Sequence, residues 1–297
     1  MIASVSLQII VLVLAFATLG FTWGARRSGS PLLAVCSRWS RWFFTGAFGG
    51  YLLSETGWTT YPFWVTASVS FLGWFLVETI YNWVVISAIS RSDLPFFPRF
   101  ELNQRTGQWP KDERSIQLRD WLRANGFKKH QSLLARMDEQ ILMHVFVYEH
   151  PESFVRVHII FLGGVGMNNA ISCAFHSLDE RKHRWVTDNL FLPYGGFYPE
   201  SWSVERRPLM QSVEQLYQRH LQRMDAALSD QWLPFEQDAL EVLNADRALL
   251  EKLNREMGFF SSEADMEDKG RITAAGRHRI WQELWTISYF GRARRYS

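Results

Sequence analysis

The 297-residue chain joins an almost uncharged first third to a charge-balanced remainder. Residues 1–90 carry four arginines and two glutamates, whereas residues 91–297 carry 28 basic and 28 acidic side chains. The net charge of +2 therefore comes from the apolar part, and the remainder has no basic excess that would indicate nucleic-acid binding. The two cysteines, Cys36 and Cys173, have no spacing typical of a disulfide framework or a zinc site.

Residues 1–90 contain three apolar stretches that predict a transmembrane module. Ile2–Trp23 has no charge and Phe63–Ile89 has only Glu78, and each is long enough to cross a bilayer as a helix. Trp42–Thr60 predicts a second, less apolar span between them. We expect the first stretch to be an uncleaved span and not a signal peptide, because its basic cluster follows the apolar run instead of preceding it.

The arginines of this region predict its orientation. Residues 24–41 carry four arginines and no acid, and Arg91, Arg99 and Arg105 follow the third stretch. Basic residues favour the cytoplasmic side of a membrane. The pattern predicts a multi-pass protein of a bacterial inner membrane, with the N-terminus outside and the C-terminal domain in the cytoplasm.

Small residues at four-residue spacing predict a helix-packing face within the second stretch. Gly46, Gly50 and Ser54 fall on one side of a helix, where the backbone of another helix can approach closely.

Glu78 is the one ionisable residue deep in a predicted span, so it needs a polar environment. Helical spacing places Trp74, Tyr81 and Asn82 on its side, which predicts a polar stripe facing the interior of the bundle. We expect a neutral carboxyl group hydrogen-bonded within the bundle. The alternatives are an ion or proton relay, or a polar contact with a partner subunit.

Residues 91–297 predict an α+β domain with a helical extension. A proline-rich linker spans 91–110, the α+β domain spans 111–232, and a helical extension with a basic tail spans 233–297. We expect a first helix capped by Asp112 and ended by Gly126. Alternating or short apolar runs then predict five strands: Leu133–Met137, Ile141–Tyr148, Phe154–Phe161, Ala170–His176 and Arg184–Leu190. Their short connections favour antiparallel pairing.

Three further helices are predicted after the strands. Two amphipathic faces, Val213–Leu228 and Leu240–Met257, predict an antiparallel helical hairpin with Pro234 between its arms. A last amphipathic helix is expected over Thr273–Tyr289. The predicted fold class is therefore three N-terminal transmembrane helices followed by a cytoplasmic α+β domain with an antiparallel sheet of four to five strands.

Three histidines form the only candidate metal site. If the strands turn about Pro151, His144 lies opposite His158, and His176 on the next strand approaches the same region. Two or three imidazoles on one sheet face suit a metal ion, but no carboxylate or cysteine completes the set. We expect hydrogen-bonded or half-exposed histidines and no cofactor.

The C-terminal helix and its tail are a candidate membrane-surface element. Trp281 and Trp285 share a helical face, and Arg292, Arg294 and Arg295 follow it, as in helices that lie on an anionic leaflet. The alternative is a helix packed on its own domain with a solvated tail.

Motifs typical of catalysis are lacking in the sequence. The glycine-rich stretch 161–169 has neither the phosphate-loop nor the dinucleotide-binding spacing, and we expect it to form a hairpin turn. No serine lies on a nucleophile elbow. In the aromatic loop 193–202, we expect Tyr194 and Tyr198 to fold back on their own domain rather than form a binding rim.

These features favour a membrane-anchored scaffold, assembly or sensing module, with protein partners or a second copy in the bilayer and no nucleic acid. The alternatives are a membrane-bound enzyme acting on a lipid-linked or hydrophobic substrate at the cytoplasmic face, or a transport component that uses Glu78.

Overall fold

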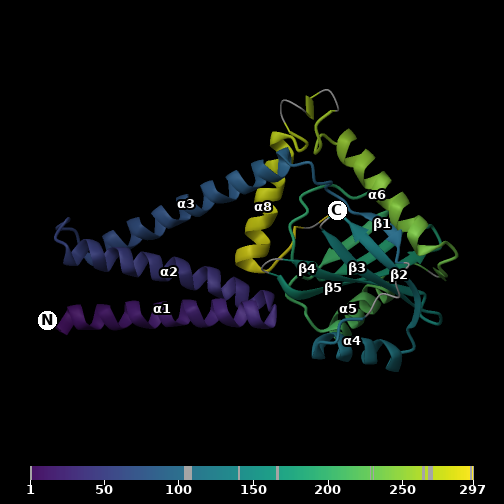
Figure 1. Cartoon of the computed structure of the whole chain (residues 1–297), viewed down its shortest axis with the longest axis horizontal. Helices are drawn as coiled ribbons and strands as arrows, with labels where there is room; N and C mark the ends of the chain where they lie inside the picture. Colours follow the sequence, from purple (N-terminus) through teal and green to yellow (C-terminus); the bar gives the residue numbers. More distant parts are fainter. Residues whose placement is uncertain are drawn as a thin grey trace. The chain divides into compact units, whose positions relative to one another are not determined.

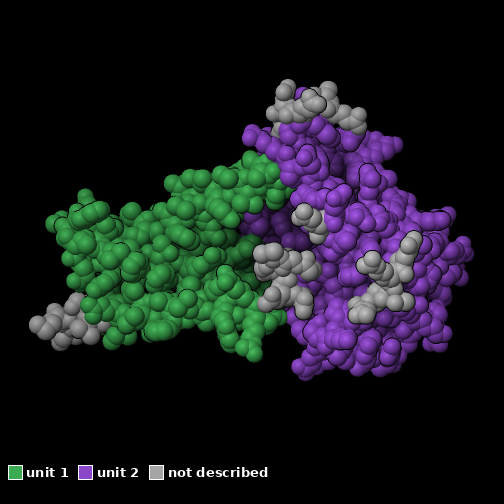
Figure 2. All heavy atoms as spheres, in the orientation of Figure 1, with its two compact units in different colours: residues 1–89, 288–291 green, residues 90–287, 292–297 purple. Residues whose placement is uncertain are grey.

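The computed structural model describes residues 2–103, 109–139, 141–164, 167–227, 229, 231–262, 265–266, 270–294 and 296. The chain forms two compact units, shown in different colours in Figure 2. Unit 1 comprises residues 1–89 and 288–291, and unit 2 comprises residues 90–287 and 292–297. The linker, the sheet and most of the helical extension thus belong to one unit.

Unit 1 is built on the helices α1 (Ile2–Ser28) and α2 (Pro31–Glu55) and on α3 (Phe63–Arg91) up to Ile89. α2 begins at Pro31 and not at Trp42, so much of the arginine-rich segment 24–41, expected between the first two spans, is helical. The local reason is a strong start signal: the Ser30 side chain accepts a hydrogen bond from the Leu33 N–H, and Pro31 occupies the first turn. Gly29, with φ of +61°, makes the preceding turn.

Among the described residues, two helical segments are long and apolar enough to cross a membrane, Ser6–Ser28 and Phe63–Arg91. α2 is not one of them, so the structure supports the first and last predicted spans and leaves the middle one, Trp42–Thr60, without support. The reason is composition, because the longer helix takes in Arg38 and Arg41 together with several serines and glycines.

The small residues of α2 bring α3 close. A Cβ atom on Gly50 would lie 2.9 Å from the backbone of Ala67, and one on Gly46 would lie 3.2 Å from the Ala67 carbonyl oxygen. Such distances leave no room for a side chain, as expected of a glycine face between helices. Ser54 does not share this role, since it is exposed and its hydroxyl donates to the Gly50 carbonyl in its own helix.

Unit 2 contains an eight-stranded sheet (Figure 1). Its strands are β1 (Arg99–Leu102), β2 (Lys128–Arg136), β3 (Leu142–His150), β4 (Val155–Gly164), β5 (Met167–Asp179), β6 (Arg184–Asp188), β7 (Trp202–Arg206) and β8 (Trp232–Leu233). The order is β1 to β7 in sequence, and β8 pairs with β5.

The predicted antiparallel series is confirmed for β2 to β6, which pair in sequence order with antiparallel neighbours. The sequence did not predict β1, β7 or β8. β1 is a short strand in the proline-rich linker, β8 has two residues, and β7 pairs parallel to β6, which the chain reaches only through the aromatic loop.

The two faces of the sheet are covered by different helices. α4 (Glu113–Ala124) and α5 (Val213–Asp225) pack on the face that carries Phe146 and Tyr148, whereas α6 (Ala239–Glu256) packs on the face that carries Val145 and Val147. α4 is the helix predicted from Asp112, whose side chain accepts from the Ser115 N–H.

The predicted helical hairpin is therefore wrong. α5 and α6 lie on opposite faces of the sheet (Figure 1), because β8 in the connection between them pairs with β5 and carries the chain to the other side.

α8 (Ala274–Phe290) is the predicted last helix. Its side chains Ile280, Glu283 and Ile287 are buried, so one face of the helix belongs to the core of unit 2.

Candidate functional site

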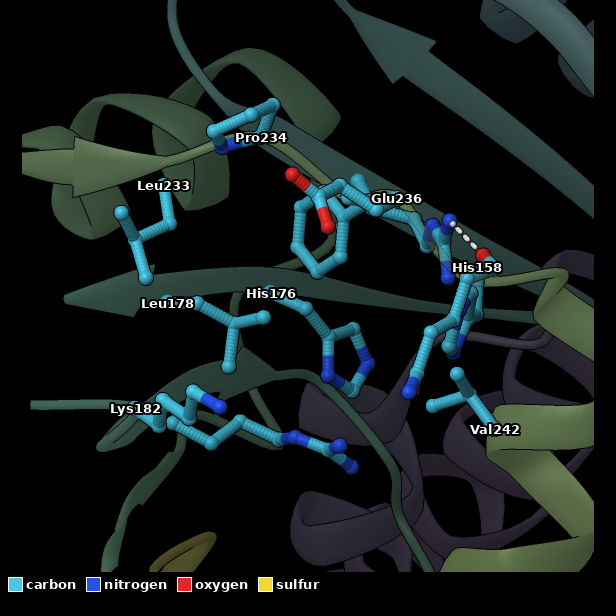
Figure 3. Close-up of a pocket in the computed structure, with 12 residues that line it drawn as sticks. His158, His176, Leu178, Lys182, Leu233, Pro234, Glu236 and Val242 are labelled. Atoms are coloured by element: carbon cyan, nitrogen blue, oxygen red, sulfur yellow. Dashed lines mark hydrogen bonds between the residues drawn. The ribbon is translucent and has the colours of Figure 1, made fainter. Parts of the chain in front are cut away.

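A cavity of about 420 Å³ lies in unit 2 on the sheet face covered by α6. Three strands place polar side chains there in register: Arg156 on β4 lies opposite His176 on β5, and Arg184 on β6 lies opposite Leu178, two residues further along β5. Because alternate residues of a strand share a face, His158 joins the same group. Strand pairing thus gathers two arginines and two histidines around one hollow (Figure 3).

The rest of the lining is largely apolar. Leu233, Pro234 and Phe235 come from β8 and the segment that follows it, Leu178 comes from β5, and Val242 comes from α6. Lys182, Glu236 and Gln237 complete the polar part of the wall. A volume of this size with apolar walls and a few convergent polar groups is typical of a small-molecule site.

The histidine pair is the unusual feature of the cavity. The ring centroids of His158 and His176 are 4.2 Å apart, and the buried Nε2 atom of each ring has no hydrogen-bond partner among the described residues. His220 shows how this domain otherwise buries a histidine, since its Nδ1 lies 2.9 Å from the Thr187 hydroxyl and its Nε2 lies 3.1 Å from the Ser177 hydroxyl. Orphaned buried polar atoms of this kind are rare in folded proteins.

Both cavity histidines are neutral at physiological pH. Burial, with a smaller contribution from the charges of Arg156 and Arg184, lowers the pKa of His158 to about 3. Burial and the neighbouring His158 likewise lower the pKa of His176 well below its ordinary value. Each ring therefore offers one N–H donor and one nitrogen acceptor.

Arg156 is held as a buried cation. Its side chain is 2 % exposed, its Nε lies 2.7 Å from Glu149 Oε1, and its Nη2 donates to the Gln237 carbonyl at 2.9 Å. Its guanidinium lies 4.3 Å from the ring centroid of Phe235.

Arg184 is held in a similar way from β6. Its Nη1 is ion-paired with Asp246 on α6, and its guanidinium lies 4.4 Å from the ring centroid of Trp202. The two arginines are thus fixed by carboxylates and aromatic rings, and one of these rings, that of Phe235, also lines the cavity.

The predicted histidine set forms only in part. His144 lies opposite Phe161, and His158 lies opposite Val147, so the expected His144–His158 pair does not exist. The hairpin turns at 151–154, with Phe154 at φ of +52°, and this shifts the pairing by three residues from the expected register. Among the described residues, no group of three or more His, Cys, Asp or Glu side chains could hold a metal ion.

Glu78 in unit 1 has partners that the sequence did not indicate. Its Oε2 accepts a hydrogen bond of 2.6 Å from Trp42 Nε1 on α2, and its Oε1 lies 3.9 Å from Arg41 Nη2. The predicted neighbours Trp74, Tyr81 and Asn82 make no hydrogen bond to it among the described interactions, and Tyr81 is exposed. These three residues lie on α3 with Glu78, whereas the Glu78 carboxylate contacts α2.

The same region of unit 1 includes Tyr289. Its ring packs edge-on against Trp42 with centroids 5.1 Å apart, and its carbonyl accepts a hydrogen bond of 2.8 Å from Trp39 Nε1. Trp42 is almost fully buried by these contacts.

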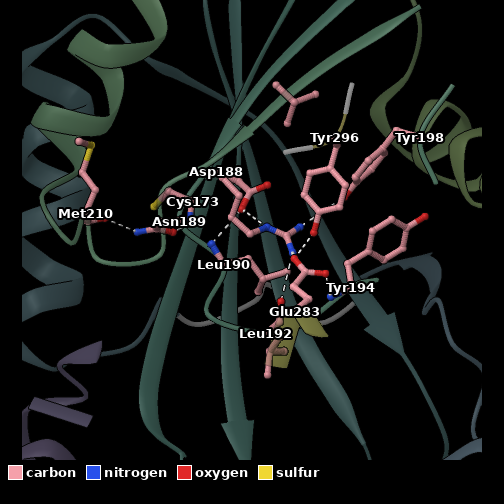
Figure 4. A network of polar contacts seen from close by, with 12 residues as sticks. Cys173, Asp188, Asn189, Leu190, Leu192, Tyr194, Tyr198, Met210, Glu283 and Tyr296 are labelled. Carbon is pink, nitrogen blue, oxygen red and sulfur yellow. Dashed lines mark hydrogen bonds and ion pairs between the residues drawn. The ribbon is translucent and has the colours of Figure 1, made fainter. Parts of the chain in front are cut away.

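Glu283 of α8 forms a buried cluster in unit 2 (Figure 4). Its Oε2 accepts from the backbone N–H groups of Tyr194, at 2.9 Å, and Gly195, while its Oε1 accepts from the Tyr296 hydroxyl. Arg206 lies 3.8 Å from the same carboxylate. This cluster fixes α8 to the aromatic loop and to the C-terminal tail.

The other predicted residues of the C-terminal element differ in their exposure. Trp281 and Trp285 are partly buried with ring centroids 6.0 Å apart, and Arg292 and Arg294 are exposed. Arg295 lies outside the described residues. Tyr194 and Tyr198 of the aromatic loop fold back onto their own domain, as expected, with both rings against Tyr296.

Sequence reasoning missed the two arginines of the cavity. The signal that could have found them is the alternation on β4, where Arg156 and His158 occupy every second position of an otherwise apolar strand. A buried strand with two consecutive polar positions on one face indicates that this face does not pack only on a core.

Comparison of the chain with protein-family models, with curated proteins and with solved structures finds no match in any of the three.

Proposed function

We propose that this chain is a membrane-anchored sensing or assembly module of a multi-subunit membrane system. One observation carries the proposal: α1 and α3 expose large apolar side chains at successive turns, whereas unit 2 has buried cores of its own. The exposed side chains include Ile9, Val13 and Phe16 on α1 and Leu72, Leu76 and Ile80 on α3. Surfaces of this extent need lipid or a partner to cover them.

In this proposal the module sits in a bacterial inner membrane with α1, α2 and α3 all crossing it. The arginines near the ends of α1 and α3 support an N-terminus outside and a cytoplasmic α+β domain. α2 would cross with its Arg41 beside Glu78, so that the Glu78 carboxyl group has a polar partner within the bundle.

Topology is tested by labelling single cysteines. In a chain that carries Cys36→Ser and Cys173→Ser, Thr60→Cys should react with a membrane-impermeant reagent added from outside, because Thr60 lies in the exposed connection between α2 and α3. A reporter that is active only in the cytoplasm, fused after Ser297, should be active. A reporter that works only outside would reverse the orientation.

The function itself is tested by isolating the tagged full-length protein from native membranes and identifying what accompanies it. A stoichiometric membrane complex, or a stable assembly of identical chains, is the expected result. Recovery of a single chain with bound lipid would favour the enzyme on a hydrophobic substrate. Ion flux in vesicles that is lost in Glu78→Gln would favour the transport component.

A further inference from the structure

The cavity in unit 2 presents more hydrogen-bond donors than acceptors. Arg156 uses Nε and Nη2 for Glu149 and Gln237, which leaves Nη1 without an acceptor among the described residues. Arg184 uses Nη1 for Asp246, which leaves Nε and Nη2. Guanidinium and ammonium groups donate and never accept, so Lys182 adds further donors.

The two guanidinium groups are fixed before any ligand arrives. Carboxylates hold one edge of each guanidinium, and the rings of Phe235 and Trp202 hold its face. A fixed guanidinium matches the two oxygens of a carboxylate or phosphate at little cost in side-chain entropy.

The remaining wall sets the second property of the ligand. Leu178, Leu233 and Val242 line the cavity together with Phe235, and they offer no hydrogen bond to a polar group (Figure 3). A ligand made only of charged groups would leave this wall uncovered, so an apolar portion is needed to fill it.

We propose that this cavity binds a small amphipathic anion, in which a carboxylate or phosphate group faces Arg156, Arg184 and Lys182 and a compact apolar group lies against Phe235 and Val242. The inference rests on the proposed sensing role, because a sensing domain needs a ligand site. His158 and His176 also line the cavity, and because both rings are neutral they add no charge to it.

Glu236 also lines the cavity and would repel an anion placed beside it. It is exposed, so water screens its charge, whereas Arg156 is buried. The anionic group therefore belongs at the arginine side of the cavity, away from Glu236.

The test uses four probes with one ring and different polar groups: benzoate, phenyl phosphate, benzyl alcohol and benzylamine. The full-length protein is placed in nanodiscs of zwitterionic lipid, and the Kd of each probe is measured by isothermal titration calorimetry. At least one anion should bind roughly tenfold more tightly than the alcohol, and the amine should bind most weakly. The stronger of the two anions distinguishes a carboxylate ligand from a phosphate ligand.

Matched variants locate the site. Lys182→Gln and Arg184→Gln should each weaken binding of the preferred anion several-fold and leave binding of the alcohol unchanged. Each substitution removes a positive charge but keeps the apolar lining of the cavity. Arg181→Gln is the control, because Arg181 is the exposed neighbour of Lys182 and does not line the cavity. Val242→Trp should block all four probes by filling the volume, and its thermal midpoint checks that the domain still folds.

Equal binding of all four probes, or anion binding that Lys182→Gln, Arg184→Gln and Val242→Trp leave unchanged in folded protein, would overturn the inference. The proposed function has a separate readout. A stoichiometric complex from native membranes, together with no probe binding, would refute only the proposed ligand site. Anion binding that depends on the cavity residues, by a chain that purifies without partners, would refute only the assembly role.

Discussion

Glu283→Ala should strongly destabilise unit 2, because the Glu283 carboxylate is fully buried and serves several donors at once. The substitution leaves two backbone N–H groups, those of Tyr194 and Gly195, and the Tyr296 hydroxyl without their acceptor. Each buried unsatisfied donor costs about 1–3 kcal/mol, and Arg206 keeps its ion pair with Asp188 at 2.8 Å. We expect a total loss of about 3–5 kcal/mol of unfolding free energy.

Glu283→Gln separates the hydrogen bonds from the charge. Its amide oxygen can still accept from Tyr194 and Gly195, so it should lose only about 1–2 kcal/mol. A loss as large as that of the alanine variant would show that attraction to Arg206 dominates the cluster.

The assay is pulse proteolysis of the full-length protein in detergent across a urea series, with the midpoint converted to free energy through the slope. Glu256→Ala is the control, since the Glu256 side chain is 61 % exposed and its nearest cation, Lys252, is 3.9 Å away. The control should change stability by less than about 0.5 kcal/mol. A Glu283→Ala chain with the wild-type midpoint would refute the reasoning.

Three further perturbations test other parts of the structure. Gly50→Ala places a methyl group 2.9 Å from the α3 backbone and should lower the thermal midpoint in detergent, whereas Gly73→Ala, which meets nothing within 4 Å, should not. Glu78→Gln should preserve abundance in membranes, whereas Glu78→Lys, beside Arg41, should reduce it on immunoblots. The unfolding free energy should fall as the pH drops below about 6.5. The reason is that His158 is protonated near pH 6.5 in the unfolded chain, whereas burial lowers its pKa to about 3 in the folded chain. His158→Leu should reduce that slope by up to about 1.4 kcal/mol per pH unit, and a variant with the wild-type slope would contradict the assignment.

Much of the secondary structure could be predicted from the sequence because its signals are local. Asp112 caps α4 through its own side chain, Gly126 with φ of +79° follows the end of that helix, and period-two alternation marks β3 and β4. The apolar runs of α1 and α3 likewise stand out by length alone. Such signals depend on residues within a few positions of one another.

The candidate site depended on contacts between distant residues. A three-residue difference in the β3–β4 register separated His144 from His158, and the separate pairing of β4 with β5 placed Arg156 opposite His176. The register depends on the geometry of the hairpin turn and on which side chains are buried on each face of the sheet. The sequence of a single strand does not specify either of these.

The sequence by itself therefore determined how the charge is divided, the antiparallel series β2 to β6, and two helices, α1 and α3, that are apolar enough for a membrane. Only the tertiary structure decided that α5 and α6 cover opposite faces of the sheet, that Trp42 is the partner of Glu78, and that Glu283 holds the aromatic loop. The physical reason is that backbone propensity acts within one element, whereas a buried polar group is satisfied by whichever distant donor the packing brings to it.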